Sequence, residues 1–241
     1  MGNIVTELAQ RLLALATQQQ YRVTFFLLYP PQIPHDTARN LIVKQFLEHK
    51  EFTHLLQIDS DVVPPSNILE MVENDVDICS AVCFVWNGEE IVPTAALQQY
   101  DEHGKRTRPK GARLSDGDKD LQEVDFIGGG CVMMKRSALE TIRASGKSAY
   151  AFDYDQDGIM WQGEDYHFSQ VARDCGLRIH VDRRFICGHY KSVDFAWLNR
   201  LIHTYWKAGD NTLLPEQHGN GNSDGGTNAR KGPPTSGGAA G

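Results

Sequence analysis

Two aspartates that follow a short apolar segment have the spacing of a cation site. Asp59 and Asp61 come directly after THLLQI, which we expect to form a buried strand. Ligands bind open α/β sheets at the carboxyl ends of the strands, and side chains two apart on an extended segment point the same way. Carboxylate oxygens suit Mg²⁺, which can neutralise a diphosphate. The pair predicts a metal and phosphate site, with a solvated turn as the plain alternative.

Further polar residues lie at the ends of other expected elements. Glu164 and Asp165 open a helix, where the helix dipole favours acidic side chains. His189 comes just after an expected strand, where a hydrogen-bonded structural histidine is the plain interpretation. The glycines at 128–130 mark a close approach of the backbone to another group, or only tight packing.

The segment DYDQDGIMWQGE, residues 153–164, matches a different motif. It fits the calcium-loop pattern D-x-D-x-D-G-x₅-E, with Asp153, Asp155, Asp157, Gly158 and Glu164 in place. An EF-hand needs a helix that runs directly into this loop, and the preceding GKSAYAF does not read as a helix end. We therefore favour a flexible acidic loop, next to the Glu164–Asp165 pair, over a calcium site.

The elements that position these residues follow from the periodicity of the apolar side chains. Helices are expected over residues 4–19, 37–49, 67–74, 137–145, 164–176 and 194–208, and strands over 21–29, 53–59, 77–85, 124–135 and 177–182. Residues 87–123 are expected to form an insertion or short hairpin, and residues 146–163 a loop. This order indicates an α/β fold with a mostly parallel central sheet and helices on both faces.

Four segments, in their order and spacing, resemble the GT-A glycosyltransferases, especially the family 2-like enzymes. They are DTARN, THLLQIDSDVVPP, VDFIGGGCVMMKR and GEDYHF, and the resemblance covers about residues 23–190. It implies the GT-A (nucleotide-diphospho-sugar transferase) fold and a metal-dependent transfer of a sugar from a nucleotide-diphosphate sugar to an acceptor hydroxyl. The implied cofactor is Mn²⁺ or Mg²⁺; the acceptor, a glycan, protein or small molecule, is not specified.

The same resemblance implies roles for six residues. Asp59 and Asp61 would hold the metal and the donor diphosphate, His189 would be a further metal ligand, and Arg39 would contact the donor nucleotide. Glu164 and Asp165 would face the acceptor, with Asp165 as the general base in an inverting enzyme. Two other functions stay open: a calcium-binding or metal-stabilised interaction protein without catalysis, and a nucleotidyltransferase. The latter would need a basic, glycine-rich phosphate loop near the N-terminus, which we do not find.

Composition sets the remaining expectations. The chain has 241 residues, 41% of them hydrophobic, which suits one α/β domain over residues 1–217. Residues 218–241 are rich in glycine and poor in apolar bulk, and we expect them to be disordered. The net charge of −7 argues against nucleic acid as a partner. Five cysteines without zinc spacing read as buried thiols in a reducing compartment. With no membrane span or signal peptide in evidence, the expected location is cytoplasmic.

Overall fold

The structure, a computed structural model, describes residues 2–24, 33–112, 114, 120–191, 196, 198–200 and 203. The chain divides into two units, Met1–Lys191 and Ser192–Gly241. In the second unit the described residues are helical, as expected for residues 194–208. The predicted domain boundary and tail at 218–241 lie outside the described residues, and so does most of the strand expected over 21–29.

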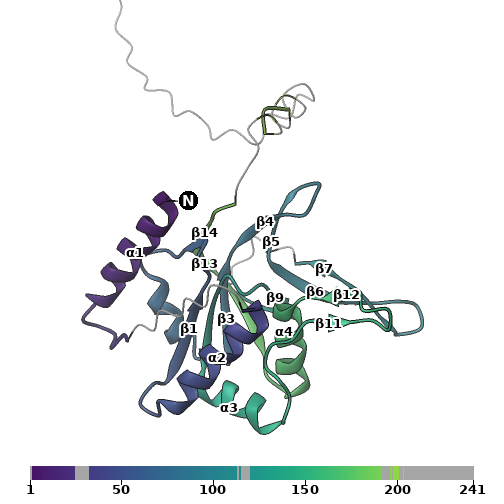
Figure 1. Ribbon diagram of the computed structural model, residues 1–241, viewed down its shortest axis with the longest axis horizontal. Helices are drawn as coiled ribbons and strands as arrows, with labels where there is room; N and C mark the ends of the chain where they lie inside the picture. The colour runs from purple at the N-terminus through teal and green to yellow at the C-terminus, as the bar shows by residue number, and fades with distance from the viewer. Residues whose placement is uncertain are drawn as a thin grey trace, which may run out of the picture. The chain divides into compact units, whose positions relative to one another are not determined.

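The first unit is a mixed α/β structure around a five-stranded sheet (Figure 1). Its strands lie in the order β1 (His54–Ile58), β10 (Cys131–Lys135), β3 (Ile78–Val82), β13 (Ile179–Ile186), β8 (Leu121–Val124). The helices are α1 (Gly2–Ala16), α2 (His35–Glu48), α3 (Arg136–Ala144), α4 (Glu164–Asp174) and the 3₁₀ helix η1 (Ile68–Asn74). The helix expected over 67–74 is therefore present, but with the tighter geometry.

The sheet is mixed, and the expectation of a mostly parallel one is not met. Among the neighbouring pairs of described strands in this sheet, β3–β13 alone is parallel, whereas β1–β10, β10–β3 and β13–β8 are antiparallel. Alternating helices and strands give parallel neighbours only when each helix carries the chain across to the adjacent strand in the same direction. Here a series of hairpins lies between β3 and β10, so β10 enters the sheet between β1 and β3 in the opposite direction.

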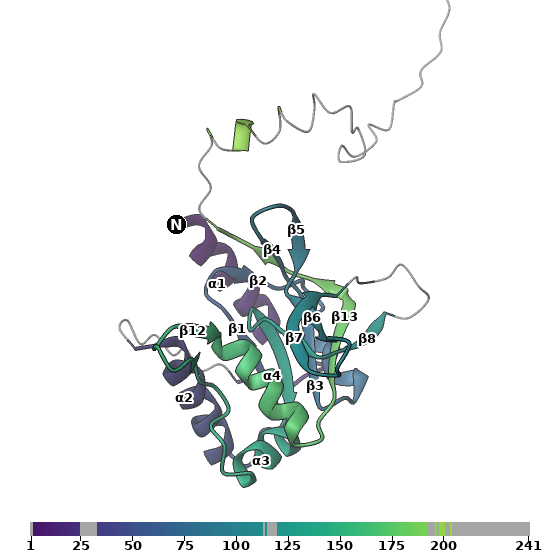
Figure 2. The same ribbon diagram turned by 90° about the vertical axis from the view of Figure 1, so that its right-hand side faces the viewer.

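Alternation along the strands divides the core between the two faces of the sheet. Val132 and Met134 of β10 pack into a cluster with residues of α2, α3 and α4, whereas Cys131 and Met133 pack into a second cluster with Leu15 of α1 and residues of η1. Helices therefore cover both faces, as expected. Figure 2 shows α2, α3 and α4 grouped together. All five cysteines are free and four are buried, which fits inert core thiols.

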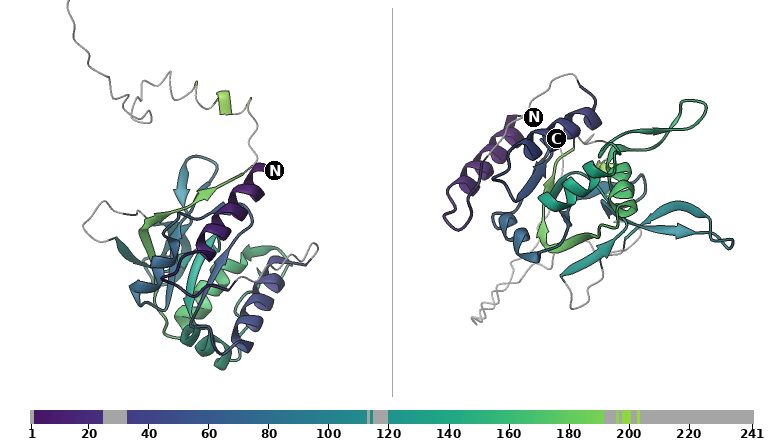
Figure 3. Two further views of the ribbon diagram at one scale, coloured as in Figure 1. Left: turned by 90° about the vertical axis from the view of Figure 1, so that its left-hand side faces the viewer. Right: turned by 90° about the horizontal axis from the view of Figure 1, so that it is seen from below.

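The stretch expected to be an insertion or short hairpin, residues 87–123, does contain hairpins, and the expected loop 146–163 contains one as well (Figure 3). Residues 84–127 hold β4 (Phe84–Trp86) paired with β5 (Ile91–Pro93), and β6 (Ala95–Tyr100) between β7 (Arg106–Gly111) and β9 (Phe126–Ile127). The expected loop 146–163 contains β11 (Asp153–Tyr154) and β12 (Met160–Gln162). The single strand expected over 124–135 is divided into β9 and β10 by the three glycines.

Candidate functional site

The end of β1 and a short two-stranded ladder place Asp59, Asp61 and His189. The Asp59 amide donates to the Gly130 carbonyl at 2.9 Å, which keeps the residue beside β10 after β1 has ended. The chain then turns into β2 (Val62–Val63), which pairs with β14 (Gly188–His189) so that His189 lies opposite Val62. Asp61 and His189 are thereby brought together, with 3.6 Å between Asp61 Oδ2 and His189 Nε2.

Arg39 on α2 is buried, with 6% of its surface exposed, and it contacts three carboxylates. Its Nη2 lies 3.1 Å from Asp59 Oδ1 and 3.4 Å from Asp165 Oδ1, and its Nε lies 3.5 Å from Glu164 Oε1. Its Nη1 donates to the Gly129 carbonyl at 3.2 Å. Burial alone would lower the pKa of Arg39, but the surrounding carboxylates outweigh it and raise that pKa, so the guanidinium is a permanent positive charge.

The absent side chain of Gly129 makes this approach possible. A Cβ at Gly129 would lie 2.4 Å from the guanidinium carbon of Arg39, which no real contact allows. At the two neighbouring glycines the conflict is with other groups: a Cβ at Gly128 would meet Thr94 at 2.8 Å, and one at Gly130 would meet Cys83 Sγ at 2.9 Å. The close approach expected from the sequence is therefore made by protein side chains, and by Arg39 at the central position.

Glu164 and Asp165 occupy the first turn of α4 and carry more negative charge than Arg39 can neutralise. Glu164 is buried, and burial followed by repulsion from Asp165 raises the pKa of Glu164. Burial likewise raises the pKa of Asp59, and the attraction of Arg39 offsets this only in part. Asp165 Oδ1 is buried without a hydrogen-bond partner. Three carboxylates around one guanidinium leave this cluster with capacity for a further positive charge or hydrogen-bond donor.

The second part of the site lies beside Asp61 and contains His189, whose ring is oriented by a hydrogen bond. His189 Nδ1 donates to the Phe84 carbonyl at 2.9 Å, and its Nε2 faces Asp61. Metal-binding histidines are commonly oriented by such a bond from the other ring nitrogen. Asp61 and His189 therefore offer a carboxylate and an imidazole nitrogen, both of which are groups that bind metal ions in proteins. Within the described residues, no three His, Cys, Asp or Glu side chains are assembled to hold an ion.

The structure thus joins all six residues selected from the sequence, but in two groups. Arg39, Asp59, Glu164 and Asp165 form the buried ion-pair cluster, while Asp61 and His189 face each other next to it. The two aspartates of the motif have different partners: Asp59 is paired with Arg39, and Asp61 with Lys191. The contact of Arg39 with a donor nucleotide remains a prediction, because the described partners of its guanidinium are carboxylates, the Gly129 carbonyl and the Tyr150 ring.

Two residues of the site were not identified from the sequence. Asn40 exchanges two hydrogen bonds with the backbone of Tyr150, at 2.7 and 3.1 Å, and so fixes the segment after α3 beside Arg39. Lys191 donates to Asp61. A signal for Lys191 exists in its position two residues after His189, since alternate residues of an extended chain share a side. For Asn40 the signal is its place directly after Arg39 in DTARN.

The calcium-loop motif is used in another way. Residues 153–162 form the β11–β12 hairpin, and no helix enters the segment, since α3 ends at Ala144. Asp153 accepts hydrogen bonds from Gln162 Nε2 at 3.0 Å and contacts His167 Nδ1 at 2.9 Å. Asp155 accepts the amides of Asp157 and Ile159 within the turn. Asp153 and Asp155 therefore stabilise a hairpin through protein hydrogen bonds, and the structure does not support a calcium site at this motif.

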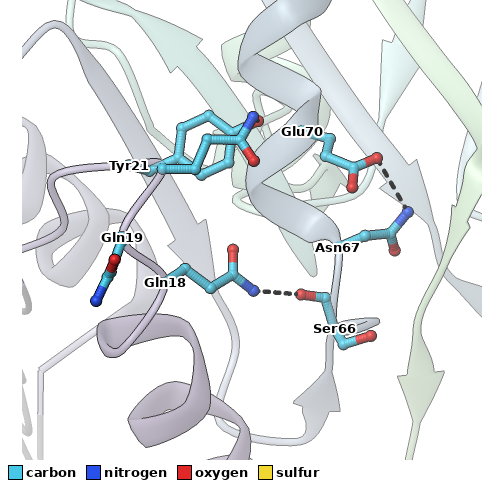
Figure 4. Close-up of a pocket in the computed structure, with 7 residues that line it drawn as sticks. Gln18, Gln19, Tyr21, Ser66, Asn67 and Glu70 are labelled. Carbon is cyan, nitrogen blue, oxygen red and sulfur yellow. Dashed lines mark hydrogen bonds between the residues drawn. The ribbon is translucent and has the colours of Figure 1, made fainter.

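A cavity of about 390 Å³ lies away from this cluster (Figure 4). It is formed where the chain leaves α1 and where η1 begins, and its lining residues are Gln18, Gln19, Gln20, Tyr21, Ser66, Asn67 and Glu70. Gln18 Nε2 donates to the Ser66 carbonyl at 2.8 Å across it. None of the six residues chosen from the sequence lines the cavity, so it does not contribute to the candidate site.

Comparison with known proteins gives only distant likenesses. No family model matches the chain, and neither does any curated protein sequence. Among solved structures, A197 from STIV matches with a TM-score of 0.46 at 15% identity, over 76% of this chain and 79% of that one. GalNAc-T7, crystallised with UDP, GalNAc and Mn²⁺, matches with a TM-score of 0.44 at 15% identity, over 69% of this chain but 32% of its own. At these scores neither likeness determines the function.

No helix among the described residues is long and apolar enough to cross a membrane.

Proposed function

We propose that this chain is a glycosyltransferase, moving a sugar from a nucleotide-diphosphate sugar to an acceptor hydroxyl with the help of Mn²⁺ or Mg²⁺. The observation that carries the proposal is convergence. Arg39, Asp59, Glu164 and Asp165 come from three separate segments and meet around one guanidinium, with Asp61 and His189 adjacent. Arg39, Asp59, Asp61, Glu164 and Asp165 lie in the segments that resemble GT-A enzymes, and the same resemblance implies His189.

In this proposal Asp61 and His189 would hold the ion, and its positive charge would stabilise the diphosphate as the bond to the sugar breaks. Asp59 has a supporting role, because Arg39 already engages both of its oxygens. Its position two residues before Asp61 makes it an anchor that orients the turn carrying Asp61.

Asp165 is the proposed general base. Its Oδ1 accepts no hydrogen bond and lies 3.4 Å from Arg39 Nη2, so this oxygen keeps the capacity to accept a proton. As the hydroxyl oxygen bonds to the anomeric carbon, its proton passes to Asp165, and the bond between that carbon and the diphosphate oxygen breaks. Arg39 keeps Asp165 and Glu164 in place through its contacts at 3.4 and 3.5 Å. Inversion at the anomeric carbon follows from this role of Asp165.

The test is a calorimetric titration of UDP and GDP with Mn²⁺ present, together with a screen of nucleotide sugars for metal-dependent hydrolysis. Asp61→Asn should abolish metal-dependent nucleotide binding, because it removes a charged ligand from a partly exposed turn while leaving the fold intact. Asp165→Asn should keep donor binding and lose transfer, since a base acts on the acceptor. Unchanged nucleotide affinity in Asp61→Asn, or equal loss of binding in Asp165→Asn, would contradict the proposed roles.

A further inference from the structure

Lys191 occupies the position of a cation in the proposed metal site. Its Nζ lies 2.5 Å from Asp61 Oδ2, and this oxygen is also the one 3.6 Å from His189 Nε2. Partial burial works to raise the pKa of Asp61, but the hydrogen bond and charge of Lys191 outweigh it and lower that pKa. The carboxylate proposed to bind a divalent ion is therefore already neutralised by a side chain of the chain itself.

The three side chains differ in how firmly they are held. His189 is fixed by the β2–β14 pairing and by its bond to the Phe84 carbonyl, and only 10% of its side chain is exposed. The Asp61 carbonyl accepts the Tyr190 amide at 2.9 Å, which joins the Asp61 turn to the chain after β14. Lys191 is the next residue, 60% of its side chain is exposed, and its long stem allows the ammonium to move.

We infer that Lys191 is an internal counter-ion, displaced from Asp61 when a divalent ion binds and then free to contact the phosphates of the donor. This inference rests on the proposed function. Phosphate is the natural second partner because a lysine ammonium binds it as a compact point charge. The Tyr190 amide bond to the Asp61 carbonyl keeps the backbone at Lys191 beside the Asp61 turn. An ammonium released at Asp61 thus stays close to the ion and the diphosphate.

The energetics favour an exchange over a permanent block. Exposed lysine–carboxylate pairs contribute little net stability, so competition from Lys191 should weaken binding of a divalent ion only about two- to five-fold. The same ammonium next to a bound diphosphate strengthens nucleotide binding by a charge-assisted hydrogen bond. Removing Lys191 should therefore change the two affinities in opposite directions, which a merely structural lysine would not do.

The experiment is a pair of calorimetric titrations on the full chain, Mn²⁺ alone and then UDP or GDP at saturating Mn²⁺. Lys191→Ala should bind Mn²⁺ about two- to five-fold more tightly than the wild type and the nucleotide about tenfold more weakly. Lys191→Arg should retain nucleotide binding. The matched control is Lys147→Ala, because Lys147 forms a comparable surface pair with Asp174 at 2.8 Å outside the site. Both affinities of this variant should equal those of the wild type.

The outcomes separate this inference from the proposed function. If Asp61→Asn loses Mn²⁺ but Lys191→Ala binds both ligands like the wild type, or binds Mn²⁺ more weakly, the role of Lys191 is wrong and the metal site stands. If the wild type fails to bind Mn²⁺, or binds it as Asp61→Asn does, the metal site itself is wrong and the role of Lys191 falls with it. If Lys191→Ala binds Mn²⁺ more tightly but keeps the nucleotide affinity of the wild type, the proposed contact of Lys191 with phosphate is wrong.

Discussion

At the scale of single residues, the site depends on a guanidinium that lies against a glycine. Arg39 is buried among three carboxylates, and its contact with the Gly129 carbonyl leaves no room for a side chain at that position. Breaking a buried ion pair costs far more than losing an exposed one, because the remaining charges stay uncompensated. Gly129 and Arg39 therefore act as one structural unit.

Gly129→Ala should destabilise the fold by about 1–3 kcal/mol, as overpacking against Arg39 forces the guanidinium from its carboxylates. Urea unfolding measures this, and the Gly129→Ala, Arg39→Lys double variant should lose less than the sum of the single variants, since lysine lacks the planar fork. Gly128→Ala is the matched control: its Cβ meets Thr94, so its effect should add to that of Arg39→Lys. If the free-energy changes of both glycine variants add to that of Arg39→Lys, Gly129 and Arg39 do not act as one unit.

At the scale of elements, the β11–β12 hairpin is attached to α4 by Asp153. Asp153→Ala removes its bonds with Gln162 and His167 and should cost about 1 kcal/mol of unfolding free energy. Calcium affinity should stay at the level of the wild type, because the carboxylates of the motif serve protein donors. Calcium titration and urea unfolding test both points, with Asp155→Ala as a control confined to the turn. Tight calcium binding that is lost in Asp153→Ala would restore the calcium-binding alternative.

The elements also show what sequence can and cannot predict here. Apolar periodicity located α2, α3, α4 and the central strands, because each buries one face on the sheet or lies inside it. The direction of β10 was missed, since strand direction depends on the hairpins between β3 and β10 and leaves no local signal. Motifs selected Arg39 and Asp59, and these two side chains form an ion pair at 3.1 Å. The sequence could not predict that Arg39 contacts three carboxylates or that Lys191 pairs with Asp61, because both contacts join residues that are far apart in the chain.

At the scale of the whole molecule, the site is a local concentration of the chain's excess negative charge. The net charge is −7, and three carboxylates share the one guanidinium of Arg39. Burial and mutual repulsion raise the pKa of both Glu164 and Asp59. Such a cluster is suited to a cationic or proton-donating ligand but costs stability in the free protein, which is the usual conflict between stability and function.

Glu164→Gln should therefore raise the melting temperature at pH 7 by about 2–4 °C, the shift expected for about 1 kcal/mol in a domain of this size. A carboxyl whose pKa is raised by folding is penalised once it is ionised. The penalty begins as pH rises above its unfolded value, near 4.5, and is complete above its folded value. Below pH 4 the variant and the wild type should melt together. Glu140→Gln, at an exposed glutamate of α3, is the control and should change little at either pH. Thermal unfolding followed by circular dichroism at pH 3.5 and 7 measures the effect. A lower melting temperature for Glu164→Gln at pH 7 would mean that its contact with Arg39 outweighs the cost of burying its charge.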